Sequence, residues 1–144
     1  MIANLALGTA MISTTVLIHT AGLIFLTRTI GAIIRRWRLH RHHLGRTVAM
    51  VATVLGLFLV HTIEIWLWAL IYVAISAIAG IAEALYFSTA TFSTIGYGDI
   101  VLSTDWRLLS ALEGVSGFLL IGWSTAYLVA ASTRHGPFRI GEHF

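Results

Sequence analysis

Three long apolar runs, separated by short polar stretches, dominate the hydrophobic pattern of the chain. They cover residues 5–26, 47–79 and 105–132. As a helix, each run is long enough to cross a hydrocarbon core of about 30 Å, and the second is long enough to tilt or to extend beyond it. The pattern predicts an all-α membrane protein with three transmembrane helices.

A fourth apolar segment, residues 81–92, is too short to span and lies immediately before Gly96 and Gly98. Irregular backbone at membrane depth is tolerated only where protein or a water-filled cavity surrounds it. We therefore expect residues 81–92 to form a re-entrant helix that leads into a non-helical loop. Glu83, in the first turn, suits the positive end of such a helix dipole.

The composition excludes an ordinary soluble domain, because 58% of the residues are hydrophobic and only 10% are charged, against about 25% charged in soluble domains. The mean hydropathy is +0.88. All nine basic residues are Arg, and six of them lie in residues 28–46. The positive-inside rule places this connection and the C-terminus in the cytoplasm and the N-terminus outside. The basic cluster indicates contact with anionic lipid rather than with nucleic acid.

The glycine-containing loop has a specific pattern, with Gly96 and Gly98 at alternate positions. Glycine adopts positive φ without a Cβ penalty, which allows successive carbonyls to point the same way. The stretch Thr91-Phe92-Ser93-Thr94-Ile95-Gly96-Tyr97-Gly98-Asp99 resembles the selectivity-filter signature of potassium channels, and we call residues 91–99 the filter segment. A simple turn is the alternative, since Gly and Asp favour turns, but the flanking apolar helices favour a filter.

The resemblance extends over residues 46–132, which look like the pore of the bacterial two-transmembrane potassium-channel family. It implies K⁺ coordination by the carbonyls of Thr94, Ile95, Gly96 and Tyr97, next to Gly98. It also implies support of the filter by Tyr86, Phe87 and Asp99, and a pore-lining or gating role for Gly117, Gly122, Thr125, Val129 and Thr133. The glycines of the last helix are equally compatible with simple helix packing. Ala90 stands where some bacterial members carry a glutamate that bonds to the filter aspartate, so Asp99 needs other support.

The filter motif occurs once, and one filter strand cannot enclose an ion, so we expect a homotetramer. Residues 1–46 then form an additional N-terminal helix with a basic connection, residues 47–133 the pore domain, and residues 134–144 a cytoplasmic tail. The first helix carries too few spaced arginines to be a voltage sensor. The expected location is the cell membrane, and the resemblance implies the bacterial inner membrane.

Three ionisable residues lie inside the apolar runs. His61 and Glu64 are three residues apart on one helix face, and His19 in the first helix lies at a broadly similar depth. A charge at mid-bilayer is costly, so we expect these residues to face protein and to contact one another. They form either an ion pathway or a structural pair that fixes helix register, and we favour register.

The remaining histidines singled out by the sequence, His40, His42, His43 and His135, are expected at the cytoplasmic side. Because histidine titrates near neutrality, they are candidate pH sensors, with simple contact to lipid headgroups as the alternative. The cluster of His40, His42 and His43 is also a candidate metal site, but its arginine neighbours disfavour a cation.

These features favour a potassium-selective channel that is passive and not an enzyme. We find no pattern of nucleophile, base and oxyanion donor, and no cofactor is expected beyond K⁺ as the permeant ion. The alternative is a non-conducting or regulatory membrane subunit that assembles with other channel chains.

Overall fold

The computed structural model describes residues 2–37 and 43–136, with the exception of the side chain of His135. Four helices make up this part of the chain: α1 (Ile2–Trp37), α2 (His43–Ala74), α3 (Ile81–Phe92) and α4 (Arg107–His135). In the described residues, α1, α2 and α4 are long and apolar enough to cross a membrane, whereas α3 has only 12 residues. The predicted all-α fold, with three spanning helices and a short one between the last two, is confirmed.

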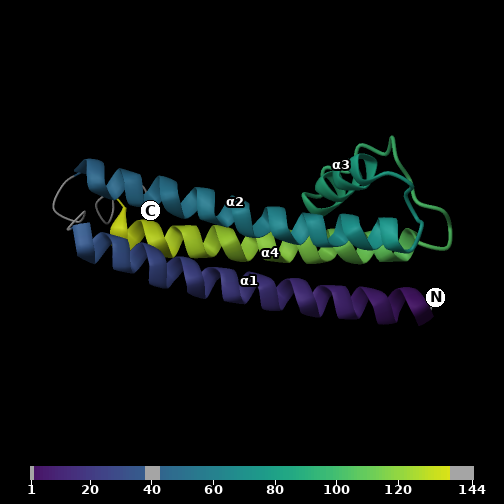
Figure 1. Cartoon of the computed structure of the whole chain (residues 1–144), viewed down its shortest axis with the longest axis horizontal. Coiled ribbons are helices and arrows are strands. Elements are labelled where there is room, and N and C mark those ends of the chain that lie inside the picture. Colours follow the sequence, from purple (N-terminus) through teal and green to yellow (C-terminus); the bar gives the residue numbers. More distant parts are fainter. Residues whose placement is uncertain (1, 38–42, 137–144) are drawn as a thin grey trace.

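The three long helices lie side by side, and α3 packs against α2 and α4 near one end of the bundle (Figure 1). The N-terminus lies at the end that carries α3 and the filter segment, and the last described residues lie at the other end (Figure 1). Helix α1 packs along α2 and α4. The additional N-terminal helix is therefore an integral part of the bundle.

The helix ends differ from the expected ones. Helix α1 continues to Trp37, where the sequence suggested a connection from residue 28, because arginines in a last turn interact favourably with the negative end of the dipole. Helix α2 begins at His43 and ends at Ala74, five residues before the expected end at residue 79. It ends there because Ser76 has a φ of 57° and the Tyr72 carbonyl accepts hydrogen bonds from the N–H groups of Ala77 and Ile78.

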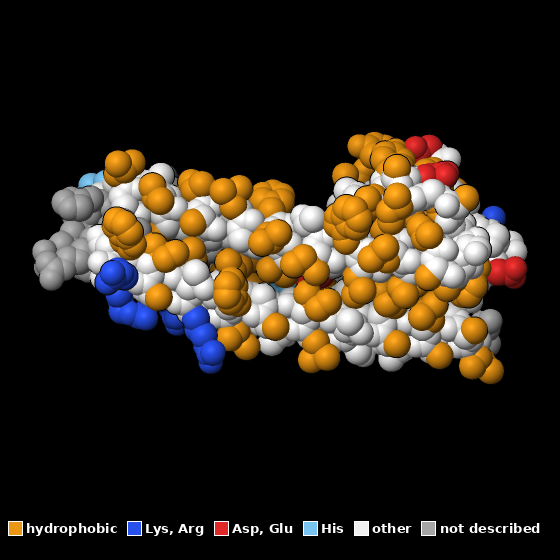
Figure 2. Space-filling model, viewed as in Figure 1, with side chains coloured by type: hydrophobic (Ala, Val, Ile, Leu, Met, Phe, Trp, Pro, Cys, Tyr) orange, Lys and Arg blue, Asp and Glu red, His pale blue; other side chains and the backbone are white. Residues whose placement is uncertain are grey.

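The interior of the bundle contains three apolar clusters along its length. At the α3 end it is built around buried aromatic side chains, including Trp68, Tyr72 and Phe92. Leu23 and Val60 belong to a second cluster farther along. Figure 2 shows hydrophobic side chains over much of the outer surface, arginines near the end of α1 and acidic residues at the opposite end. This distribution is typical of a protein whose sides face lipid or other apolar chains.

Polar contacts also attach α1 to α4 and to the loop that precedes it. The Asn4 amide donates to the Asp105 carbonyl at 2.7 Å, and the Thr27 and Tyr127 hydroxyls lie 3.0 Å apart. Between them, the Thr15 and Ser116 hydroxyls lie 3.4 Å apart in a buried position. Contacts at several depths therefore fix both the position and the rotation of α1.

Close packing of α1 on α2 depends on glycine. An ideal Cβ on Gly22 would lie 2.6 Å from a γ-carbon of Val60, a β-branched side chain with little freedom to move. We therefore expect Gly22→Ala to destabilise the chain by about 1 to 3 kcal/mol through overpacking. Thermal unfolding in detergent measures the effect.

Gly31→Ala is the matched control, because an added Cβ there meets only the flexible Arg35 side chain, at 3.4 Å. Both changes remove a helical glycine from α1, so their difference isolates the packing effect. Equal unfolding midpoints for the two variants would contradict the glycine-dependent contact.

Candidate functional site

The filter segment begins at the C-terminal end of α3. Every second residue from Thr94 to Gly98 has a left-handed backbone conformation: the φ values of Thr94, Gly96 and Gly98 are 61°, 55° and 78°. Positive φ at the two glycines agrees with the conformation argued from the sequence. Thr94 extends the alternation to a residue that pays a Cβ penalty, so the surrounding structure must hold it there. The Gly96 N–H donates to the Ala90 carbonyl at 3.1 Å, which anchors the segment to the end of α3.

The filter segment lies on the surface of the single chain. Ile95 is 56% exposed and Tyr97 is 69% exposed, and an ideal Cβ on Gly96 or Gly98 would meet nothing within 4 Å. A surface turn does not account for two large exposed apolar side chains beside a strained backbone. Strain of this kind is typical of functional sites.

Asp99 is supported by Tyr86, whose hydroxyl donates to the Asp99 carboxylate at 2.7 Å. This hydrogen bond lowers the pKa of the Asp99 carboxyl and raises the pKa of Tyr86. Asp99 therefore has a side-chain hydrogen-bond donor from α3, supplied by Tyr86. Phe87 instead turns inward, where its ring meets the edge of Tyr72 at a centroid distance of 5.2 Å.

A second support, not foreseen from the sequence, centres on Glu113 of α4. Its carboxylate is fully buried and accepts hydrogen bonds from the Tyr72 hydroxyl at 2.6 Å and the Ser88 hydroxyl at 2.5 Å. Ser88 also lies 3.0 Å from the Ile65 carbonyl. One carboxylate therefore connects α2, α3 and α4 beside α3, the helix that leads into the filter segment. Its signal in the sequence is a single acidic residue inside an apolar helix.

Helix α4 carries the residues assigned to the pore lining or gate. Gly117 is in close contact with the Phe92 carbonyl, so its small size serves packing against the end of α3. An ideal Cβ on Gly122 would meet nothing within 4 Å. Thr125, Val129 and Thr133 are spaced four residues apart and are all exposed, so they share one uncovered face of α4 in the single chain.

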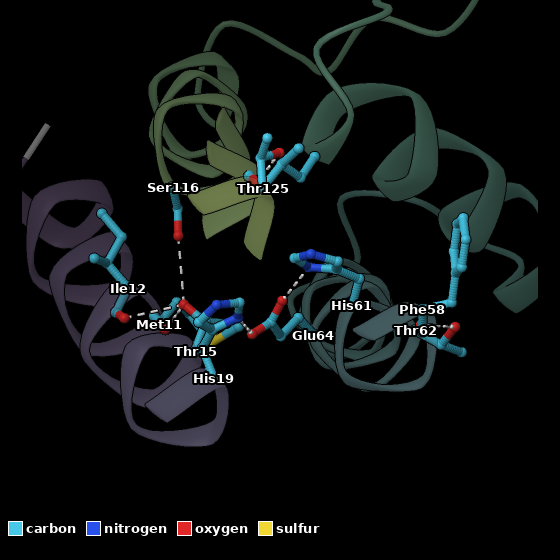
Figure 3. Close-up of polar contacts among 11 residues, drawn as sticks. Met11, Ile12, Thr15, His19, Phe58, His61, Thr62, Glu64, Ser116 and Thr125 are labelled. Carbon is cyan, nitrogen blue, oxygen red and sulfur yellow. Dashed lines mark hydrogen bonds and ion pairs between the residues drawn. The ribbon is translucent and has the colours of Figure 1, made fainter. Parts of the chain in front are cut away.

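The structure brings His19, His61 and Glu64 together (Figure 3). The Nδ1 atom of His19 lies 3.0 Å from Glu64 Oε1, and the Nδ1 atom of His61 lies 2.8 Å from Glu64 Oε2. His19 and Glu64 are fully buried, while the His61 side chain is 16% exposed. The His61 ring lies 5.8 Å from the ring of Phe92, the last residue of α3. This cluster therefore joins α1 to α2 beside the base of the filter segment.

A cavity of about 750 Å³ is lined by residues of α2, α3 and α4. Its lining is mostly apolar and includes Phe58 and Leu128, with His61, Thr62 and Thr125 among its polar members. Figure 2 shows the surface hollowed beside α3. The cavity gives His61 access to the outside of the single chain.

The cytoplasmic histidines are described only in part. His43 begins α2 and is exposed. His40, His42 and the side chain of His135 lie outside the described residues, so the roles of these four histidines as pH sensors, and of His40, His42 and His43 as a metal site, stay predictions.

Removal of the Tyr86 hydroxyl should change the titration of Asp99. A lowered pKa means that the hydrogen-bonded carboxylate is fully formed above the ordinary aspartate pKa and is lost as the pH falls through the lowered value. In Tyr86→Phe the pKa of Asp99 should rise toward its ordinary value, as followed by the carboxyl carbon shift in NMR. Tyr127→Phe removes a distant hydroxyl and serves as control. Superimposable Asp99 titrations in Tyr86→Phe and wild type would refute the support role.

The Glu113 network predicts a partner-dependent loss of stability. Glu113→Leu leaves the buried Tyr72 hydroxyl unpaired and should lower the free energy of unfolding by about 1 to 3 kcal/mol. Tyr72→Phe added to Glu113→Leu should recover part of the loss, because both polar partners are then absent. Glu83→Leu, which removes an exposed carboxylate from α3, is the control. Strictly additive effects in this double-mutant cycle would show that the contact contributes no coupling.

Comparison with curated proteins and with solved structures finds no match to the chain. Among protein families, the one described as "Ion channel" matches residues 60–134, which is just over half of the chain. The match covers the C-terminal part of α2, all of α3, the filter segment and α4 up to Arg134. The three spanning helices indicate a multi-pass membrane protein, and the chain belongs to this ion-channel family.

Proposed function

We propose that the protein is a potassium-selective channel in which four chains each contribute one filter segment. The observation that carries the proposal is the alternating backbone at Thr94, Gly96 and Gly98, within a sequence that resembles a potassium filter and in a chain of an ion-channel family. In this arrangement the carbonyls of Thr94, Ile95, Gly96 and Tyr97 replace the hydration shell of K⁺ at successive rings. Repulsion between ions at adjacent rings then drives conduction.

The fourfold assembly explains the exposed features of the single chain. The side chains of Ile95 and Tyr97, the lining of the 750 Å³ cavity and the Thr125 face of α4 are uncovered in one chain. A closed ring of four chains gives each of these surfaces a neighbour or a pore to face. Closed cyclic symmetry is also the arrangement that places equivalent carbonyls around one axis.

The orientation proposed is the one expected from the arginines. The filter segment and the N-terminus face the outside of the cell membrane, and the arginine-rich end of α1 faces the cytoplasm and anionic lipid. In support, Arg28, Arg35 and Arg36 are exposed in the C-terminal part of α1. Figure 2 shows basic side chains gathered toward the end of the bundle that is remote from α3.

Reconstitution of the purified chain alone tests conduction. Liposomes with opposed K⁺ and Na⁺ gradients should show a current that reverses near the K⁺ equilibrium potential. If the chain is silent in lipids that support a control channel, the chain is instead a subunit that needs other channel chains.

Gly98→Ala tests the filter backbone. An alanine in the left-handed region costs about 1 to 2 kcal/mol in each chain, and four copies share the ring, so K⁺ current should be abolished. Gly80→Ala is a matched control, because neither added Cβ has a neighbour within 4 Å and Gly80 has an ordinary extended φ of −115°. Unchanged preference for K⁺ over Na⁺ in Gly98→Ala would rule out carbonyl coordination by this segment.

A further inference from the structure

The buried cluster of His19, His61 and Glu64 brings together three side chains that can each bind a metal ion. One potential ligand atom from each residue lies within 4.8 Å of those of the other two. Two imidazoles and one carboxylate are the donor set of catalytic Zn²⁺ sites of the His₂Glu type. We infer that these three residues form an intramembrane site for a divalent transition metal ion of the Zn²⁺ class, which clamps α1 to the pore domain.

The separations are close to those that an ion needs. Tetrahedral Zn²⁺ with ligands at about 2.0 to 2.2 Å holds those ligands about 3.4 Å apart. Glu64 lies 3.0 Å from His19 and 2.8 Å from His61, one imidazole at each carboxylate oxygen. With one carboxylate oxygen as ligand, its separation from the adjacent imidazole nitrogen must open by roughly 0.5 Å, and each longer separation, at most 4.8 Å, must close by about 1.4 Å at most. Rotations of the three side chains supply such changes.

Hydrogen bonds within the cluster do not satisfy all of its polar atoms. The Nε2 atom of His19 is buried and has no hydrogen-bond partner in the described part of the chain. The His19 ring is enclosed by Trp123 of α4, at a centroid distance of 5.3 Å, and by His61, at 5.4 Å. A buried polar atom without a partner carries a desolvation cost, so the hydrogen bond to Glu64 leaves one nitrogen of the His19 imidazole unsatisfied.

Charge also favours a cation. With both imidazoles neutral and Glu64 ionised, the cluster carries one negative charge inside the hydrocarbon region, which is costly. A divalent ion reverses this charge, and a hydroxide or chloride in a fourth position neutralises it. His61 lines the 750 Å³ cavity, so a fourth ligand and the ion itself have a path from that side.

The donor set also specifies the class of ion. Imidazole nitrogen suits Zn²⁺, Ni²⁺ and Cu²⁺, whereas Mg²⁺ and Ca²⁺ prefer sites made of oxygen. His19 comes from α1, while His61 and Glu64 come from α2. A bound ion therefore joins the additional helix to the pore domain. The ion site lies close to the end of α3, because the His61 ring contacts the ring of Phe92. This inference concerns metal binding alone and does not depend on potassium selectivity.

The test uses the full chain in detergent, with the five histidines outside the cluster replaced by Gln, so that His40, His42, His43, His135 and His143 cannot bind metal. After incubation with Zn²⁺ and dialysis against Mg²⁺, elemental analysis should find one Zn²⁺ per chain. His19→Gln and Glu64→Gln each remove a ligand and retain hydrogen bonding, so each should weaken Zn²⁺ binding by about 100-fold or more. No retained Zn²⁺ in the background protein, or undiminished Zn²⁺ in either variant, would overturn the site and leave only a hydrogen-bonded cluster.

A second variant gives a gain rather than a loss. His19→Cys replaces one nitrogen ligand by a thiolate, which prefers softer ions. Titration with Cd²⁺ should show binding at least about 10-fold tighter than in the background protein, and a cysteine on the exposed side of α1, Thr20→Cys, should bring no such gain. Equal Cd²⁺ affinity in His19→Cys and Thr20→Cys would also overturn the site.

Discussion

Backbone N–H and C=O groups have no water to bind inside a bilayer, and the architecture of this chain depends on that constraint. A helix satisfies its own backbone, but residues 93–106 are not helical. Most of these residues are exposed in the single chain, and α3, which packs on α2 and α4, fixes the point at which they begin. Helix α3, the buried aromatic side chains of the core and the Gly96–Ala90 hydrogen bond all hold a short stretch of irregular backbone in place.

Two buried carboxylates connect the helices. Glu113 accepts hydrogen bonds from Tyr72 of α2 and Ser88 of α3, and Glu64 pairs with His19 and His61 farther along the bundle. Because an unpaired polar group in the bilayer is costly, each carboxylate favours one arrangement of the helices around it. The register role expected from the sequence for the His19, His61 and Glu64 contacts stays a prediction, and close packing such as that of Gly22 on Val60 acts in the same direction.

The sequence predicts the helices well because length and hydropathy decide whether a segment can span. It also predicts α3 at residues 81–92, since Gly80 and the filter glycines border the apolar segment. The helix ends are less predictable, because polar residues such as Arg35 fit a helix end as well as a connection. The partnership of Glu113 with Tyr72 depends on residues 41 positions apart, which no local pattern encodes. His61 and Glu64 were recognisable as a pair because they share a helix face.

The contact of Gly117 with the Phe92 carbonyl joins backbone to backbone without an intervening side chain. Side chains act as springs, since they rotate between rotamers and absorb small displacements. Backbone has no such compliance, so a sideways movement of α4 at this point is transmitted to the end of α3 almost undiminished. The middle of α4 is therefore coupled tightly to the base of the filter segment, whereas the part of α4 around Gly122 has no such close contact to restrain it.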